Sequence, residues 1–131
     1  MATTDATLAL EAARALSAKQ AGKIVILDVS RVLVITDHFV IASGNTERQV
    51  RTLASEVERR LQPLGVRPAR REGEREGRWV VLDYVDFVVH IFHHEARDYY
   101  ELERLWSDAD EVPFEDDYFE PDDDSAAAQA T

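Results

Sequence analysis

The chain has 131 residues and a formal net charge of −11, from 26 acidic and 15 basic side chains. This length is typical of one domain, and it lets the chain bury about two-thirds of its unfolded surface, enough for a core without disulfides. The sequence contains no cysteine, which excludes a disulfide scaffold, a thiolate metal site and a thiol nucleophile. No apolar run approaches the roughly 20 residues that span a bilayer. We therefore expect a soluble, cytoplasmic protein with no membrane partner.

The acidic charge is concentrated at the C-terminus. Residues 107–131 contain ten acidic side chains and no lysine or arginine, so residues 1–106 are nearly neutral. An acidic block of this kind cannot bury enough apolar area to offset its ordering entropy. We expect one domain over 1–106 and a disordered tail over 107–131. The tail either only adds solubility or, through Phe114, Tyr118 and Phe119, docks on a basic partner. Its charge argues against direct, sequence-specific binding to nucleic acid.

The first 30 residues predict a helix and a strand. Apolar side chains recur at helical spacing over Leu8–Leu16 in an alanine-rich run. Thr4 and Asp5 are candidate caps of this helix, and Gly22 is its expected end. Residues 23–29 contain a continuous β-prone apolar run, Ile24 to Leu27, which is typical of a strand buried on both faces.

A second strand and a longer helix follow. The strand is expected over 38–43, and Gly44 ends it. The helix carries an apolar stripe made of Val50, Leu53, Ala54, Val57 and Leu61. Residues 67–78 contain five arginines and three glutamates with almost nothing apolar, and predict a loop.

Both ends of the longer helix have recognisable signals. Thr46 and Gln49 have the spacing of a capping box, although Asn45 is an equal candidate for the cap. Pro63 and Gly65 are expected to end the helix.

A hairpin is predicted from two strand-like runs, 79–83 and 86–92, separated by Tyr84 and Val85. With a two-residue turn, Asp83 would face Asp86. Alternation then gives one wholly apolar face that must be core, made of Val80, Leu82, Phe87, Val89 and Ile91. The opposite face is mixed and comprises Trp79, Val81, Asp83, Asp86, Val88, His90 and Phe92.

The mixed face has two interpretations. If it is open to solvent, it is an aromatic patch with a polar rim, which marks a protein-interaction site. If a helix covers it, His90 is a hydrogen-bonded core histidine. The helical stretch after His93 and His94 adds an interface-like mixture of side chains that includes Arg97, Tyr99, Tyr100, Leu102, Leu105 and Trp106.

Two chemical sites are weaker alternatives. His90, His93, His94 and Glu95 are possible zinc ligands, but adjacent or odd-spaced side chains at the end of a strand point to opposite faces. We therefore expect no metal and no cofactor.

Paired carboxylates are the second alternative. Asp83 and Asp86 could hold a metal for phosphoryl transfer, with Ser43 and Gly44 before the helix as a phosphate-binding turn. The aspartates flank a hairpin turn, where this residue type is common for local hydrogen bonding, and one glycine without a following lysine is a weak signal. Turn chemistry is the better interpretation.

Several segments, in this order, resemble the ribosomal silencing factor family, also called Iojap-related proteins. The resemblance runs from about Leu8 to Trp106 and leaves out the acidic tail. Its motifs are Thr36 to Gly44, Arg48-Gln49-Val50, Trp79 to Tyr84, Asp86 to Phe92 and Glu95 to Trp106. The chain departs from the family at Val85, where glycine is usual.

The resemblance implies a fold and a function. The fold would be α/β, a mixed central sheet with helices mainly on one face and a nucleotidyltransferase-like topology without catalytic activity. The function would be to bind the large-subunit ribosomal protein conventionally called L-fourteen and to block joining of the small subunit when nutrients run short. Organellar relatives assist ribosome assembly, and free members are often homodimers.

A binding module is therefore the main hypothesis, and a divergent metal-dependent nucleotidyltransferase is the alternative. The predicted partner-binding residues are Trp79, Tyr84, His90, Phe92, Arg97, Tyr99, Leu102 and Trp106.

Overall fold

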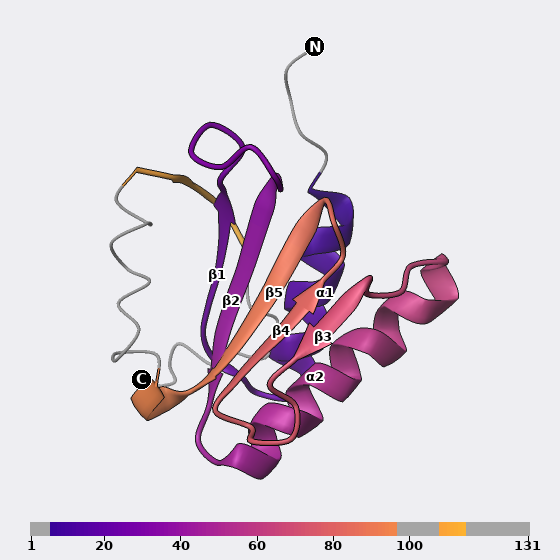
Figure 1. Ribbon diagram of the computed structural model, residues 1–131, viewed down its shortest axis with the longest axis vertical. Helices are drawn as coiled ribbons and strands as arrows, with labels where there is room; N and C mark the ends of the chain where they lie inside the picture. Colours follow the sequence, from indigo (N-terminus) through magenta and orange to yellow (C-terminus); the bar gives the residue numbers. More distant parts are fainter. Residues whose placement is uncertain (1–5, 97–107, 115–131) are drawn as a thin grey trace, which may run out of the picture.

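A computed structural model describes residues 6–96 and 108–114 as a single sheet with helices behind it (Figure 1). The elements in chain order are α1 (Thr7–Ala18), β1 (Gly22–Asp28), β2 (His38–Gly44), α2 (Glu47–Leu61), the 3-10 turn η1 (Gln62–Leu64), β3 (Arg70–Glu72), β4 (Trp79–Asp83), β5 (Phe87–His93) and β6 (Asp110–Val112). The strand order is β3-β4-β5-β2-β1-β6. β2 and β5 pair in parallel and the other neighbours are antiparallel. The mixed α/β sheet expected from the sequence is confirmed.

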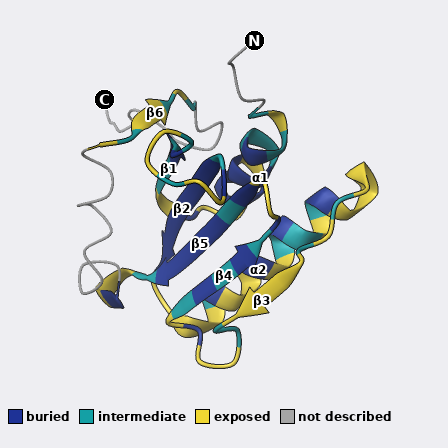
Figure 2. Cartoon of the chain, turned by 45° about the horizontal axis from the view of Figure 1, so that its top comes forward, coloured by how far each residue is buried: buried dark blue, intermediate teal, exposed yellow. Residues whose placement is uncertain are grey.

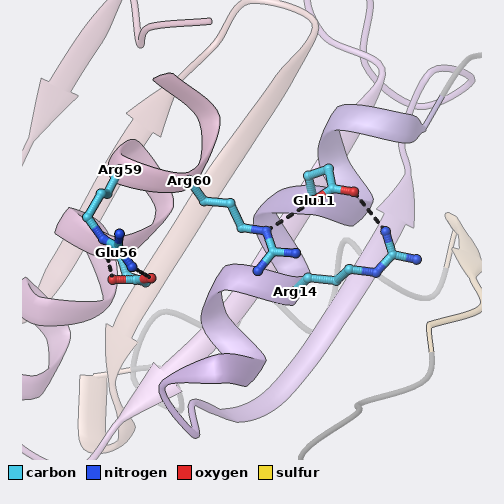
Figure 3. Close-up of polar contacts among 5 residues, drawn as sticks. All are labelled: Glu11, Arg14, Glu56, Arg59 and Arg60. Carbon is cyan, nitrogen blue, oxygen red and sulfur yellow. Dashed lines mark hydrogen bonds and ion pairs between the residues drawn. The ribbon is translucent and has the colours of Figure 1, made fainter. Parts of the chain in front are cut away.

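The helices α1 and α2 pack on the same face of the sheet, as expected. They share one apolar core with the inward side chains of the strands, among them Val80, Leu82, Val89 and Ile91. The ion pair between Arg60 Nε of α2 and Glu11 Oε1 of α1, at 3.0 Å, ties the helices together (Figure 3). The opposite face of the sheet, which we call the outer face, carries a second apolar cluster around Phe39, Ile41 and Phe92.

The central strands follow the sequence prediction more closely than β1 does. Every residue of β2 is buried, because β2 has a strand on each side and α1 and α2 over one face. In β1 only Ile26 and Leu27 are buried, and its first two residues are exposed. Among the described residues, the outer neighbour of β1, β6, pairs only with residues 26–28. Burial of the whole 23–29 run was therefore a wrong prediction.

The ends of α2 are confirmed in detail. Thr46 Oγ1 accepts a hydrogen bond from the Gln49 N–H at 3.0 Å, while Gln49 Oε1 accepts one from the Asn45 N–H at 2.7 Å. Thr46 is therefore the N-cap, and Asn45 contributes only its backbone N–H, because the glutamine side chain reaches one residue further back than in a simple capping box. At the other end Pro63 lies in η1, and Gly65 follows with a left-handed φ of 85°.

The first helix differs from its prediction. α1 ends at Ala18, and Gly22 is the first residue of β1 instead of the helix stop. The candidate caps Thr4 and Asp5 lie outside the described residues.

Two short edge strands correct the predicted organisation. β3 lies inside the arginine-rich segment that was expected to be a loop, and all three of its residues are exposed. β6 lies inside the segment assigned to the acidic tail, where it pairs with β1, and Val112 and Phe114 pack against the core. The domain therefore extends beyond residue 106, to Phe114. Both strands are three residues long and charged, so neither shows a period-two apolar pattern.

The β4–β5 hairpin forms with a register two residues away from the predicted one. Trp79 pairs with Phe92 and Val81 with His90. The Tyr84 N–H donates to the Phe87 carbonyl at 2.9 Å, so the tip of the hairpin is one pair later than expected. Because the shift is an even number of residues, every side chain keeps its predicted face.

The hairpin turn has an unusual backbone. Val85 adopts a φ of 75°, and the Asp86 N–H donates to the Tyr84 carbonyl at 2.9 Å, which closes a γ-turn. The Val85 N–H itself donates to Asp83 Oδ1 at 2.8 Å. A β-branched residue is strained in this conformation. Valine at the position where glycine is usual therefore does not prevent the positive φ.

Candidate protein-binding face

The outer face of β4 and β5 is built around a tryptophan that is held in place by a histidine. The Trp79 Nε1–H donates to His90 Nδ1 at 3.1 Å. The indole also stacks on Phe92, with ring centroids 5.1 Å apart and planes 26° apart. These contacts fix both the position and the tilt of the indole, which a binding anchor needs in order to lose little entropy on association.

His90 is neutral in this arrangement. Its Nδ1 accepts the indole hydrogen bond, so the proton must be on Nε2, and that atom is buried with no partner among the described residues. Burial lowers the pKa of His90 from 6.5 to about 4, and the negative charge of Asp83 acts in the opposite direction. Phe39 of β2 meets the imidazole edge-on at 4.6 Å and completes the aromatic cluster.

The predicted partner-binding residues differ in exposure. Trp79 is partly exposed, whereas His90 is 8% exposed and Phe92 is fully buried. Of the two interpretations of the mixed face, the core histidine is therefore the correct one for His90. Because His90 and Phe92 lie beneath the surface, they support Trp79 and do not themselves present a contact area.

Tyr84 is separated from the other candidates. It belongs to the core on the helix side of the sheet and stacks on Phe87 at 4.8 Å, with planes 8° apart. It is 6% exposed, and burial raises the pKa of its hydroxyl. The physical reason is strand alternation, which continues through Tyr84 and turns it to the face of Leu82. The remaining candidates, Arg97, Tyr99, Leu102 and Trp106, lie outside the described residues.

The possible zinc ligands do not form a site within the described ranges, where no three histidine or acidic side chains come together. His93 and His94 stack on each other at 4.7 Å, and His93 Nδ1 accepts a hydrogen bond from the Glu95 N–H at 3.3 Å. His90 points to the outer-face cluster.

Asp83 and Gly44, two of the residues of the nucleotidyltransferase alternative, have structural roles. Asp83 Oδ1 accepts a hydrogen bond from the Val85 N–H in the turn, which is the local hydrogen bonding that the sequence predicts. Asp83 also forms an ion pair with Arg70 at 3.5 Å. A Cβ at Gly44 would lie 3.2 Å from the Val50 backbone nitrogen, so the glycine permits close packing of β2 against α2. Neither position needs a phosphate or a metal to explain it.

Phe39 is the residue that sequence reasoning missed. It lies on β2, about 50 positions before His90 in the chain, and reaches it through the parallel pairing of β2 with β5. Only its place in an apolar strand was visible in the sequence. Figure 2 shows the result of this pairing, with β2 and β5 buried along most of their length and β3 exposed at the edge.

The fold and the site together define an α/β domain with α1 and α2 on one face and an anchored, partly exposed tryptophan on the other. Among the described residues no helix is long and apolar enough to cross a membrane. The chain matches the family model described as "Ribosomal silencing factor during starvation" over residues 2–131. The chain belongs to this family.

Similar proteins agree with that assignment. The ribosomal silencing factor RsfS of Halalkalibacterium halodurans is 41% identical over 104 residues, which cover 79% of this chain and 89% of that protein. The mouse protein named mitochondrial assembly of ribosomal large subunit protein 1 is 30% identical over 92 residues, 68% of this chain and 40% of its own length. A crystal structure of a protein from Chromobacterium violaceum superposes with a TM-score of 0.77 at 31% identity and covers 91% of this chain and 98% of that one.

Proposed function

We propose that this protein binds the large ribosomal subunit through L-fourteen and sterically prevents the small subunit from joining, which represses translation when nutrients are limiting. Its place of action is then the cytoplasm, with the ribosomes. A homodimer of the free protein, formed through the same face, belongs to this proposal. Membership of the silencing factor family supports it, and the name of the mouse relative connects that protein to the large subunit.

The observation that carries the proposal is that Trp79 is held in a fixed position and is partly exposed. The helices α1 and α2 cover the other face of the sheet, and the indole is partly exposed on an otherwise buried aromatic cluster. An aromatic side chain that is already fixed by His90 and Phe92 is suited to be the centre of a protein interface. The mechanism requires no chemistry, because a domain seated near the subunit interface occupies space that the small subunit requires.

The test is binding of Trp79→Ala to isolated large subunits by co-sedimentation, followed by a subunit-joining assay in sucrose gradients. We expect a loss of affinity of roughly 30-fold, which corresponds to about 2 kcal/mol for a central aromatic anchor. Wild-type protein should bind large subunits, not small ones, and reduce the number of joined ribosomes. The variant should require a correspondingly higher concentration to do so.

Two controls separate binding from folding. Leu64→Ser removes an apolar side chain that is 53% exposed in η1, at the end of α2, and should bind as wild type does. Trp79→Phe keeps a ring on Phe92 but loses the hydrogen bond to His90, so its affinity should lie between those of wild type and Trp79→Ala. Normal binding by a folded Trp79→Ala protein would remove the outer face from the proposal.

A further inference from the structure

Two neighbouring apolar side chains project fully from the loop 29–37, which joins β1 to β2. Val34 is 101% exposed and Ile35 is 83% exposed. Both are β-branched, in a connection between antiparallel neighbours where polar residues are the rule. The exposure of both at adjacent positions therefore requires an explanation beyond the fold.

The loop holds this pair in an ordered position. Its base is closed by a hydrogen bond from the Val29 N–H to the Asp37 carbonyl at 2.9 Å, and the Leu33 N–H donates to the Val29 carbonyl at 2.7 Å. On one side of the pair Leu33 packs against the outer-face cluster, and on the other Thr36 is 5% exposed. The two exposed side chains are thus presented between two anchored residues, which reduces the entropy that binding would cost.

The loop is continuous with the outer face at one end of the sheet. The Asp37 and His38 N–H groups donate to the Asp86 carbonyl at 2.9 and 3.3 Å, so the base of the loop contacts the β4–β5 turn. Val85 in that turn is 59% exposed. Figure 1 shows the loop and the turn together at the upper end of the sheet.

We propose that Val34 and Ile35 insert into an apolar hollow of the protein that the outer face binds, as a second contact beside Trp79. This inference rests on the proposed function and extends its contact surface. Residues 32–36 carry no charge, and Arg31, the one basic side chain of the loop, is paired with Asp110 at 3.4 Å, so Val34 and Ile35 themselves present no group that attracts RNA phosphates. The occupant is therefore a protein surface.

Two side chains provide far less than the roughly 800 Å² per partner that a stable complex buries, so the loop must add to a larger interface.

A second copy of this chain fits the pair poorly. The two described hollows of this chain lie along α2 and the β3 segment, and their lining includes Glu58, Arg67 and Arg71. Such charged surroundings do not receive an apolar pair.

The first test measures affinity. We expect the double variant Val34→Ser, Ile35→Ser to bind isolated large subunits roughly tenfold more weakly than wild type or worse. Its thermal unfolding should match that of wild type, because fully exposed side chains contribute no burial. Leu64→Ser, on an equally apolar but helix-side position, is the matched control and should keep wild-type affinity.

The second test identifies the occupant. Because the chain has no cysteine, Ile35→Cys gives a single attachment point for a benzophenone maleimide, with Leu64→Cys as the control position. On large subunits we expect a crosslink from position 35 to a ribosomal protein. A crosslink to RNA, to a second copy or within the same chain would overturn the inference.

The two proposals fail in different ways. If wild-type protein does not bind large subunits, the proposed function is wrong, and so is the proposed contact through Val34 and Ile35. If wild type binds and the double variant binds equally well, only the proposed contact through Val34 and Ile35 is wrong. Loss of affinity with a crosslink to a ribosomal protein supports both.

Discussion

Replacing Val85 by glycine should stabilise the protein. Val85 adopts a φ of 75° in the β4–β5 turn, and this region costs a non-glycine residue about 1–2 kcal/mol. Glycine removes that strain but adds about 0.5–1 kcal/mol of unfolded-state entropy. The side chain is 59% exposed, so little burial is lost, and the backbone hydrogen bond from position 85 to Asp83 is kept. We expect a net gain of about 1 kcal/mol.

The assay is urea unfolding followed by fluorescence, with thermal unfolding alongside. For a domain of this size, a gain of 1 kcal/mol raises Tm by roughly 4 °C. Val85→Ala is the matched control, because it removes the β-branch but keeps the Cβ that causes the strain, and it should change stability by less than about 0.5 kcal/mol. An unchanged or lower midpoint for Val85→Gly, or an equal gain for Val85→Ala, would show that the turn does not store strain in φ.

Other predictions concern the core and its caps. Thr46→Ala should cost about 1 kcal/mol through loss of the hydrogen bond to the Gln49 N–H, and an unchanged urea midpoint would show that this cap does not stabilise α2. Leu53→Ala, at a fully buried position of α2, should cost about 2–5 kcal/mol in the same assay, and a cost below 1 kcal/mol would contradict its place in the core. The lowered pKa of His90, about 4, means that the unfolded chain binds this proton first, so its contribution to stability is complete above about pH 6.5 and is lost as the pH falls toward 4. The difference in unfolding free energy between wild type and His90→Gln should therefore shrink over this range, and a constant difference would argue against a neutral His90.

Local sequence patterns were sufficient to predict those elements whose structure depends only on their own residues. The apolar stripe and caps of α2 follow from spacing and from side-chain hydrogen bonds within a few residues. The faces of the hairpin follow from alternation, which a register shift of two residues does not alter. The family resemblance rested on the same segments and led to the family that the chain belongs to.

The sequence by itself therefore determined the mixed α/β class, the core face of the hairpin and the family. Tertiary structure decided the rest, because pairing between distant strands leaves no local signal. It placed β6 beside β1 and so moved the domain boundary to Phe114, and it brought Phe39 against His90 through a parallel pair. It also buried His90 and left Val34 and Ile35 exposed. Apolar composition predicts that a side chain prefers burial, but only the packed fold decides which side chains obtain it.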